Sequence, residues 1–271
     1  MKLKDKIVVI TGASSGIGKA LAAEFAARGA NLVLGARRYV TLCQITESLE
    51  KQYPIRALAV SCDVAIEEDC AHLIKQAITT FGRIDILINN AGITMRALFK
   101  DTDVKVLKTL MDVNFWGTVY CTKYALPEIL KTRGSIVGVS SIAGYKGLPG
   151  RSGYSASKFA MNGFLDALRV ENLKTGVHVL TASPGFTASN IRNTALNKNG
   201  QSQGESTLDE ANMMTAEEVA KAIADAVENR SRTLILTRQG KLTVLLNKIL
   251  PAWLDGKVYD LFAKERNSLL K

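Results

Sequence analysis

The sequence has few of the residues from which metal centres and disulfide frameworks are built. Only four of its 271 residues are cysteine and two are histidine, and no pair of cysteines has a Cys-x-x-Cys spacing. We therefore expect neither disulfides nor a bound metal. No apolar run is long enough to span a membrane, and the first strand pattern begins at Lys6, which leaves no room for a signal peptide. Together these absences predict a reducing, cytoplasmic location.

Long runs of one charge are also absent, although the net charge is high. The chain carries 35 basic and 25 acidic residues, a formal net charge of +10, without a run of five or more lysines and arginines. We therefore expect no nucleic-acid partner, whereas a phosphorylated cofactor or an anionic substrate would suit the basic surface. With 47% apolar and 22% charged residues, the length fits one large globular domain, or two small ones, with a sizeable core.

What the chain does contain is a regular alternation of short apolar runs and helical patterns. We expect strands at residues 6–11, 31–36, 55–61, 85–89, 134–141, 177–182 and 233–236. We expect helices at residues 19–27, 41–51, 67–80, 104–113, 117–131, 154–173 and 216–228. Strands that are apolar throughout and separated by helices indicate an α/β fold with a parallel sheet buried on both faces.

A glycine cluster connects the first strand to the first helix. Gly12, Gly16 and Gly18 have the spacing Gly-x-x-x-Gly-x-Gly and lead directly into an Ala-rich helical pattern. A strand, a glycine turn and a helix open a dinucleotide-binding unit, in which backbone amides and the helix N-terminus receive a pyrophosphate. An ordinary turn is the alternative, and the position between this strand and this helix favours phosphate binding.

The second strand ends without an acidic residue. NAD sites usually place a carboxylate there for the ribose 2′-hydroxyl, whereas a 2′-phosphate requires a cation. Arg37 and Arg38 occupy this position, which favours NADP over a simple role in capping the next helix. Beyond the third strand, Asp63 would accept a hydrogen bond from an adenine amino group or cap the following helix. Beyond the fourth, the Asn-Ala-Gly sequence at residues 90–92 would let backbone approach a ligand or form a plain turn.

Tyr154 and Lys158 form the clearest catalytic pattern. Four residues apart on a helix, they share one face, where an ammonium would lower the pKa of the phenol from its ordinary value of about 10. Such a phenol can exchange a proton near neutral pH. A surface tyrosine and a solvated lysine are the alternative for an isolated pair. Ser140 and Ser141 end the fifth strand, at the edge where parallel sheets bind ligands.

The last third of the chain contains two less regular segments. Residues 188–212, rich in Asn, Ser, Gln and Gly, follow the sixth strand and predict a mobile substrate lid. Residues 241–271, the C-terminal extension, carry an apolar helical stripe interrupted by basic residues. We expect this stripe to pack on its own domain or on a second subunit, and the alternative is an amphipathic helix on a membrane surface.

Several of these features occur together in the order found in one enzyme family. They are Thr11 to Gly18, Asn89 to Gly92, Asn114, Ser141, Tyr154, Lys158 and Pro184-Gly185. With them the chain resembles the short-chain dehydrogenase/reductase family from about Lys6 to Leu236. The resemblance implies a single Rossmann-type domain over residues 1–271, with a doubly wound parallel sheet of seven strands, and assembly into a homodimer or homotetramer. It also implies NAD(P)-linked interconversion of a carbonyl and an alcohol without a metal.

The resemblance further implies a role for each matching residue. Tyr154 would donate a proton to the carbonyl oxygen, or act as the base when an alcohol is oxidised. Lys158 would lower the tyrosine pKa and hold the nicotinamide ribose, Ser141 would hydrogen-bond the substrate oxygen, and Asn114 would anchor a water that relays protons to Lys158. The residues expected to contact NADP(H) are Gly12, Ser14, Ser15, Gly16, Ile17, Gly18, Arg37, Arg38, Asp63, Val64, Asn90, Ala91, Gly92, Tyr154, Lys158, Pro184, Gly185, Thr187 and Ser189. The loop departs from some NADP-preferring members, which carry Lys or Arg where this chain has Ser15.

The leading functional hypothesis is an NADPH-dependent carbonyl reductase that acts on a moderately apolar small molecule. The extension around Trp253 looks like that of family members acting on lipophilic carbonyls such as steroids, retinoids or long-chain ketones. One alternative is a 3-oxoacyl-[acyl-carrier-protein] reductase, whose acidic partner would suit the net charge. The other is a non-catalytic NADP-binding scaffold, which would predict damage at Ser141, Tyr154 and Lys158, although all three are intact.

Overall fold

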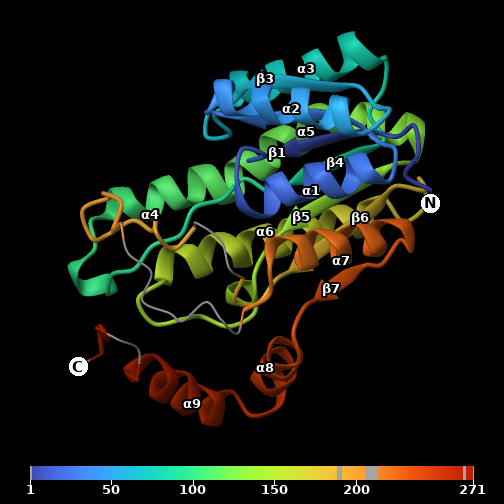
Figure 1. The fold of residues 1–271 in the computed structure, drawn as a ribbon. Helices are drawn as coiled ribbons and strands as arrows, with labels where there is room; N and C mark the ends of the chain where they lie inside the picture. The colour runs from blue at the N-terminus through green and yellow to red at the C-terminus, as the bar shows by residue number, and fades with distance from the viewer. Residues whose placement is uncertain (1, 188–190, 205–212, 265–266, 271) are drawn as a thin grey trace.

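The computed structural model describes residues 2–187, 191–204, 213–264 and 267–270. Seven strands pair in parallel into one sheet in the order β3-β2-β1-β4-β5-β6-β7 (Figure 1). They are β1 (Ile7–Thr11), β2 (Asn31–Ala36), β3 (Ala57–Ser61), β4 (Ile86–Asn89), β5 (Ser135–Val139), β6 (His178–Ser183) and β7 (Thr233–Ile235). The predicted doubly wound parallel sheet of seven strands is confirmed.

Helices connect the strands and cover both faces of the sheet. They are α1 (Gly16–Ala27), α2 (Tyr39–Gln52), α3 (Glu67–Phe81), α4 (Val104–Met111), α5 (Gly117–Thr132), α6 (Ser152–Glu171), α7 (Ala216–Glu228), α8 (Arg238–Ile249) and α9 (Pro251–Ala263). Short turns of helix are η1 (Phe99–Asp101), η2 (Asp112–Trp116) and η3 (Ile142–Gly144).

The core lies in two layers, one on each side of the sheet. Successive residues of a strand point to opposite faces, so β1 contributes to both layers. Val8 and Ile10 pack with side chains of α1, α2 and α7, whereas Val9 packs with side chains of α3, α5 and α6. All three strand residues are fully buried. This two-sided burial explains why the strands are apolar throughout.

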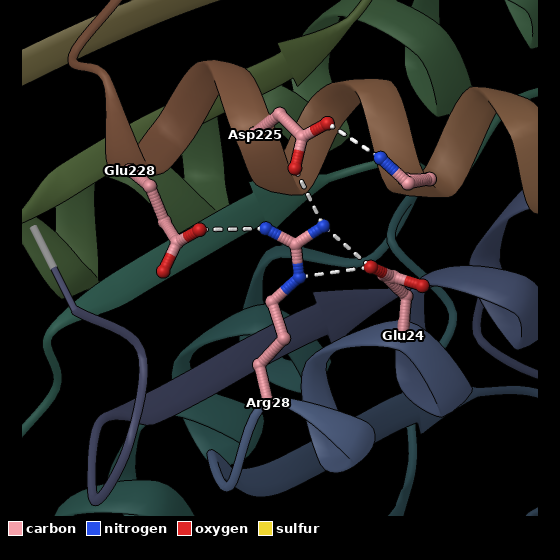
Figure 2. Close-up of polar contacts among 5 residues, drawn as sticks. Glu24, Arg28, Asp225 and Glu228 are labelled. Carbon is pink, nitrogen blue, oxygen red and sulfur yellow. Dashed lines mark hydrogen bonds and ion pairs between the residues drawn. The ribbon is translucent and has the colours of Figure 1, made fainter.

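Helix α1 is tied to α7 by a group of charged side chains at the surface of the first layer. Figure 2 shows the Arg28 guanidinium between Glu24 of its own helix and two carboxylates of α7. Its Nη1 lies 2.7 Å from Glu228 and its Nη2 lies 2.7 Å from Asp225. Hydrogen bonds from Arg28, which has the larger effect, and from Lys221 lower the pKa of Asp225. The group therefore holds two helices together that are about 200 residues apart in sequence.

Two boundaries differ from the sequence expectation in ways that affect the site. The helices predicted at 104–113 and 117–131 run into each other through η2, a π-helical turn that contains Asn114. The strand predicted at 134–141 ends at Val139, so Ser140 and Ser141 leave the sheet before η3 begins. Neither change follows from residue periodicity, because a π turn and a strand end are set by which backbone groups find partners.

The C-terminal extension forms α8 and α9, which lie beyond β7 and below the sheet in Figure 1. Their buried residues are Gly240 in α8 and Leu254 and Phe262 in α9. The expected packing on the chain's own domain therefore accounts for only part of the apolar stripe. No helix among the described residues combines the length and the apolar character needed to cross a membrane.

Candidate active site

The residues predicted to bind the cofactor meet in one cleft at the carboxyl ends of the strands. β1 is paired with both β2 and β4, so the chain winds outward in opposite directions from this point, which is where open α/β sheets bind ligands. The cleft has a volume of about 1310 Å³. Among its lining residues are Gly12, Ser14, Ser15, Gly16, Ile17, Gly18, Arg37, Arg38, Asp63, Val64, Asn90, Ala91, Gly92, Ser141, Tyr154, Lys158, Pro184, Gly185 and Thr187. Ser189 lies outside the described residues.

The glycine loop forms the floor of one end of this cleft. A Cβ on Gly18 would lie 2.3 Å from the Gly12 carbonyl oxygen, and a Cβ on Gly12 would lie 2.8 Å from Cα of Ala91. Gly12 and Gly16 also have φ values of +66° and +52°, which L side chains rarely adopt. No side chain caps the amino terminus of α1, which begins at Gly16. Its first N–H groups are therefore available to an anion.

Asn90 has a structural task that the sequence did not reveal. Its side-chain Nδ2 donates to the carbonyl oxygens of Thr11 at 2.9 Å and of Gly12 at 3.4 Å. The Thr11 hydroxyl in turn accepts the backbone N–H groups of Asn90 and Ala91, both at 3.0 Å. These bonds fix the end of β4 against the end of β1. Asn90, which was expected to contact the cofactor, therefore also shapes the glycine loop.

Two arginines stand at the rim of this end of the cleft. Nε and Nη2 of Arg38 donate to the Ser14 hydroxyl at 3.2 and 3.0 Å. Nη1 of Arg37 lies 3.8 Å from an Asp63 carboxylate oxygen. Both arginines are exposed, so their charges face solvent at the junction of β2 and the glycine loop. Ser14 and the two guanidinium groups could receive a phosphate there.

Asp63 and Val64 follow β3 and form the wall beside these arginines. The Asp63 carboxylate accepts the backbone N–H of Ala65 at 3.1 Å, and its own N–H donates to Asp69 at 2.8 Å. This is an Asx-type turn, so part of the role of Asp63 is local. Val64 packs directly on Gly117, where an added Cβ would lie 2.8 Å from the valine Cβ. The adenine contact expected of Asp63 remains a prediction.

Tyr154, Ser141 and Lys158 converge farther along the cleft. Helix α6 supplies Tyr154 and Lys158, and the loop after β5 supplies Ser141, whose Oγ accepts the N–H of Ala143 at 3.1 Å. Burial raises the pKa of Tyr154, while its hydrogen bond with Ser141 and the positive charge of Arg151 act in the opposite direction. Nζ of Lys158 donates to the Val139 carbonyl oxygen at 2.8 Å. Its burial lowers the Lys158 pKa to about 8.

The four-residue spacing predicts that the Lys158 ammonium lowers the pKa of the Tyr154 phenol. In this structure Nζ lies 5.9 Å from the centre of the Tyr154 ring, and its nearest partner is the Val139 carbonyl. Burial therefore outweighs the ammonium, and the pKa of Tyr154 is raised rather than lowered. The helical spacing correctly placed both side chains on one face. It could not predict the distance between Lys158 Nζ and the Tyr154 ring or the burial of the phenol.

Asn114 lies behind the cleft in the π-helical turn η2. It is fully buried, its Nδ2 donates to the Ile93 carbonyl at 2.9 Å and to the Ser157 hydroxyl at 2.8 Å, and its Oδ1 accepts the Ile93 N–H at 2.8 Å. An added Cβ on Gly92 would lie 3.2 Å from Asn114 Oδ1 and 3.5 Å from Lys158 Nζ. Asn114 thus fixes the loop after β4 beside the lysine, and its proposed water relay remains a prediction. Single π turns frequently mark functional sites.

The loop after β6 also lines the cleft. Pro184 and Gly185 line the cleft, and the Thr187 hydroxyl donates to the Gly185 carbonyl at 3.2 Å. A Cβ on Gly185 would lie 3.0 Å from the hydroxyl oxygen of Thr237, which itself has a φ of +66°. The start of α8 therefore presses on this loop, a contact between segments that sequence reasoning did not connect.

The far end of the cleft is lined by residues that the sequence argument placed only in part. Thr94 and Leu148 line it, and so do residues 191–192 and 194–196 of the predicted lid. Leu196 pairs with Met95, because its N–H donates to Thr94 and its carbonyl accepts from Arg96, both at 2.9 Å. The contribution of α9 was missed. Its lining residues are Val258, Leu261 and Phe262, and the signal for them was the apolar stripe of the extension.

Comparisons with known proteins agree with this architecture. A family model described as short chain dehydrogenase matches residues 6–200. A relative from Arachis hypogaea, 11-beta-hydroxysteroid dehydrogenase A, is 44% identical over 188 residues, which are 69% of this chain and 53% of the relative. The chain therefore spans about half the length of the curated relatives it matches first.

Two solved structures share the fold. A short-chain dehydrogenase/reductase from Burkholderia phymatum in complex with NAD has a TM-score of 0.83 at 22% identity, covering 94% of this chain and 96% of its own. An alcohol dehydrogenase from Thermococcus sibiricus complexed with 5-hydroxy-NADP has a TM-score of 0.76 at 24% identity, covering 86% and 96%. Nicotinamide nucleotides of both types are thus bound by proteins of this fold.

Proposed function

Because the chain belongs to the short-chain dehydrogenase/reductase family, we propose that it interconverts a carbonyl and an alcohol on a moderately apolar small molecule, using NADP(H). The observation that carries the proposal is the convergence of Ser141, Tyr154 and Lys158 on one cleft with the glycine loop. An intact acid, its hydrogen-bond partner and a buried cation beside a nucleotide cradle are what coupled proton and hydride transfer requires. A non-catalytic scaffold would have no need of all three.

The residues of the cradle fit a dinucleotide. A Cβ on Gly12 or Gly18 would collide with the backbone of Ala91 or Gly12, so the loop keeps this shape only with glycine, and the uncapped start of α1 offers N–H groups to a pyrophosphate. Arg37, Arg38 and Ser14 would hold a 2′-phosphate, because two guanidinium groups and a hydroxyl meet at the end of β2 where an NAD site would need a carboxylate. When bound, the nicotinamide supplies or accepts the hydride.

The chain's own residues would manage the proton. During reduction the substrate oxygen gains negative charge, so donors must already point at it. Tyr154 would donate its phenolic proton, and Ser141, already hydrogen-bonded to that phenol, would share the position of the oxygen. With its pKa lowered to about 8, Lys158 is still mainly charged at pH 7, so it can stabilise the phenolate that remains.

The far end of the cleft supports an apolar substrate. Met95, Leu148, Leu196, Val258, Leu261 and Phe262 contribute apolar side chains to its wall, beside polar residues such as Arg96 and Gln203. The relative from Arachis hypogaea is called a hydroxysteroid dehydrogenase, which agrees with a bulky apolar carbonyl or alcohol. The net charge of +10 favours a second candidate, reduction of 3-oxoacyl groups on an acidic carrier protein. Turnover of simple ketones with no activity on any 3-oxoacyl thioester would exclude it.

The deciding experiment is the Tyr154→Phe variant, measured for NADPH oxidation with a panel of ketones, including steroid ketones. We expect the rate to fall by about 10² to 10⁴, because the proton donor is removed, while NADPH affinity stays nearly unchanged. Tyr124→Phe is the matched control, since the Tyr124 hydroxyl binds Glu67 on the surface and should be dispensable. Activity retained by Tyr154→Phe, or a parent protein that binds NADPH but reduces nothing in the panel, would contradict the proposal.

A further inference from the structure

The connection between α8 and α9 is a run of exposed apolar residues. Residues 249–253, with the sequence Ile-Leu-Pro-Ala-Trp, are all exposed. The exposed fractions of Ile249, Leu250 and Trp253 are 64%, 50% and 52%. Leu242 and Leu245 of α8 are also half exposed and lie on the same helical face as Ile249, because they precede it by seven and four residues. Five consecutive exposed apolar residues are unusual on a surface that faces only water.

This surface is turned away from the rest of the chain. The two helices are anchored to the body through the side that faces the cleft, by an ion pair between Lys146 and Asp255 and by the Asn247 side chain, which donates to the Tyr145 carbonyl at 2.9 Å. A third anchor is Phe262, whose ring lies 4.9 Å from the Arg151 guanidinium. In Figure 1 the turn between α8 and α9 lies at the lower edge of the molecule, well separated from the sheet.

Lysines border the apolar run. Lys248 immediately precedes it, Lys241 lies one helical turn before Leu245, and Nζ of Lys257 lies 5.6 Å from the centre of the Trp253 ring. Residues 238–264 contain five basic side chains and two acidic ones, and one of the two, Asp255, is paired with Lys146. Tryptophan and lysine side chains combine an apolar body with a polar tip, which suits the boundary between lipid headgroups and acyl chains.

We propose that the α8–α9 corner, defined as Leu242, Leu245, residues 248–253 and Lys257, docks on an anionic phospholipid bilayer. The apolar residues would enter the acyl boundary, and the lysines would contact the headgroups, as in helices that lie on a membrane surface. The corner does not depend on the redox reaction proposed above. Membrane docking is a property beyond that reaction. It would place the outer side of α9 against lipid, while Val258 and Leu261 of the same helix line the cleft.

The lysines favour a bilayer over a second copy of the chain. A two-fold contact through this corner would bring the same residues of both copies together, including Lys248 and Lys257. Like charges would then face each other without an acidic partner from the corner, whereas anionic lipids would neutralise them. Apolar area alone would suit either occupant, so the charge pattern decides.

The test is co-sedimentation of the full chain with vesicles of phosphatidylcholine alone or mixed with phosphatidylserine. We expect binding to the mixed vesicles that weakens with added salt. The Leu250→Ser, Trp253→Ser double variant should bind at least about tenfold more weakly, and Lys248→Gln, Lys257→Gln about fivefold more weakly per lysine. Val170→Ser, Leu173→Ser is the matched control, because both side chains are at least as exposed as Leu250 and Trp253, at 59% and 70%, and lie near the end of α6. NADPH oxidation with a water-soluble ketone should be unchanged in all variants.

Fluorescence gives a second measurement. Trp253 emission should shift to shorter wavelength on mixed vesicles, and Trp253→Phe should remove the shift. No binding by the parent, or equal binding by the parent and the Leu250→Ser, Trp253→Ser variant, would overturn the proposal. The proposal would also be overturned if the parent did not bind vesicles and formed a dimer, and if the Leu250→Ser, Trp253→Ser variant were monomeric. That result would assign the corner to a second copy of the chain.

Discussion

The two ends of the cleft differ in how tightly they are packed. At the glycine loop, a Cβ added to Gly18 would lie 2.3 Å from a backbone oxygen. On α9, at the other end, the cleft-lining side chain of Leu261 is 46% exposed. The glycine loop at the nucleotide end is thus packed backbone against backbone, and most residues that line this end lie within the first 92 residues. The substrate end is lined by Leu148 and by residues from the segments 94–96, 191–203 and 258–262. Substitutions at the glycine loop would therefore disrupt the nucleotide end, whereas substitutions of side chains at the substrate end would change the shape of its wall.

This difference has a physical cause. A pyrophosphate is recognised by backbone N–H groups, and only a missing Cβ lets backbone approach it closely. An apolar substrate is recognised by the shape of a wall, which any set of side chains of suitable volume can form. Between the two ends lie Tyr154 and Lys158, which both the cofactor and the substrate would need.

Lys158→Met should have the largest effect and should separate stability from activity. Burial lowers the Lys158 pKa from 10.5 to about 8, so the folded protein carries a desolvated ammonium at pH 7. Removing it should raise the free energy of unfolding by roughly 2 kcal/mol, after allowance for the Val139 carbonyl left without its donor, and lower activity by about 10² to 10⁴.

The difference in unfolding free energy between Lys158→Met and the parent should depend on pH, with a defined sign. Because the folded-state pKa is below the unfolded value, the ammonium destabilises the fold fully below pH 8, and this effect disappears as the pH rises towards 10.5. Urea denaturation of both proteins from pH 6 to about 10 should therefore show the advantage of Lys158→Met shrinking above pH 8. A variant less stable than the parent at pH 7 would show that the Val139 contact outweighs the burial of the charge.

Gly18→Ala tests whether the nucleotide end is as intolerant as its geometry indicates. The added methyl group would meet the Gly12 carbonyl, so we expect a loss of roughly 1–3 kcal/mol in unfolding free energy and about a hundredfold weaker NADPH binding. Gly163→Ala in α6 is the control, because nothing lies within 4 Å of its added Cβ. It should stabilise the helix by about 0.5–1 kcal/mol. Equal behaviour of the two variants in calorimetry would contradict the comparison.

Arg37→Gln, Arg38→Gln tests the charge at the same end. The double variant should bind NADPH about 10 to 100 times more weakly, with little change for NADH, because only NADPH carries the 2′-phosphate. Titration by cofactor fluorescence would measure both constants. Lys123→Gln, Lys131→Gln on the exposed side of α5 removes the same net charge and should leave both constants nearly unchanged. An equal loss for NADPH and NADH in the arginine variant would remove the argument for NADP.

Leu261→Ala tests the substrate end and should have the smallest effect. We expect kcat/KM to fall about threefold to tenfold for a bulky apolar ketone and to stay unchanged for a small one, with unaltered NADPH binding. Leu242→Ala in α8 is the control, since Leu242 is similarly exposed but does not line the cleft. Weakened NADPH binding by Leu261→Ala would show that the two ends are not independent.

Much of the nucleotide end could be predicted from sequence because its signals are local. The glycine spacing, the arginines after β2 and the four-residue step from Tyr154 to Lys158 each concern neighbours in sequence. The contacts that were missed are between distant segments. Asn90 holds the Thr11 and Gly12 carbonyls across 79 and 78 residues, and Arg28 binds Asp225 across 197. Periodicity does not identify such partners.

By itself, the sequence determined the seven-stranded α/β fold, the order of its elements and the residues that meet at the carboxyl edge of the sheet, because apolar period and glycine position act on adjacent backbone. Only the tertiary structure decided that burial, and not the Lys158 ammonium, dominates the pKa of Tyr154. It also decided that α9 completes the cleft while the α8–α9 corner remains exposed. Both outcomes depend on how deeply a side chain is buried and on which distant atoms surround it, and these are set only when the layers pack together.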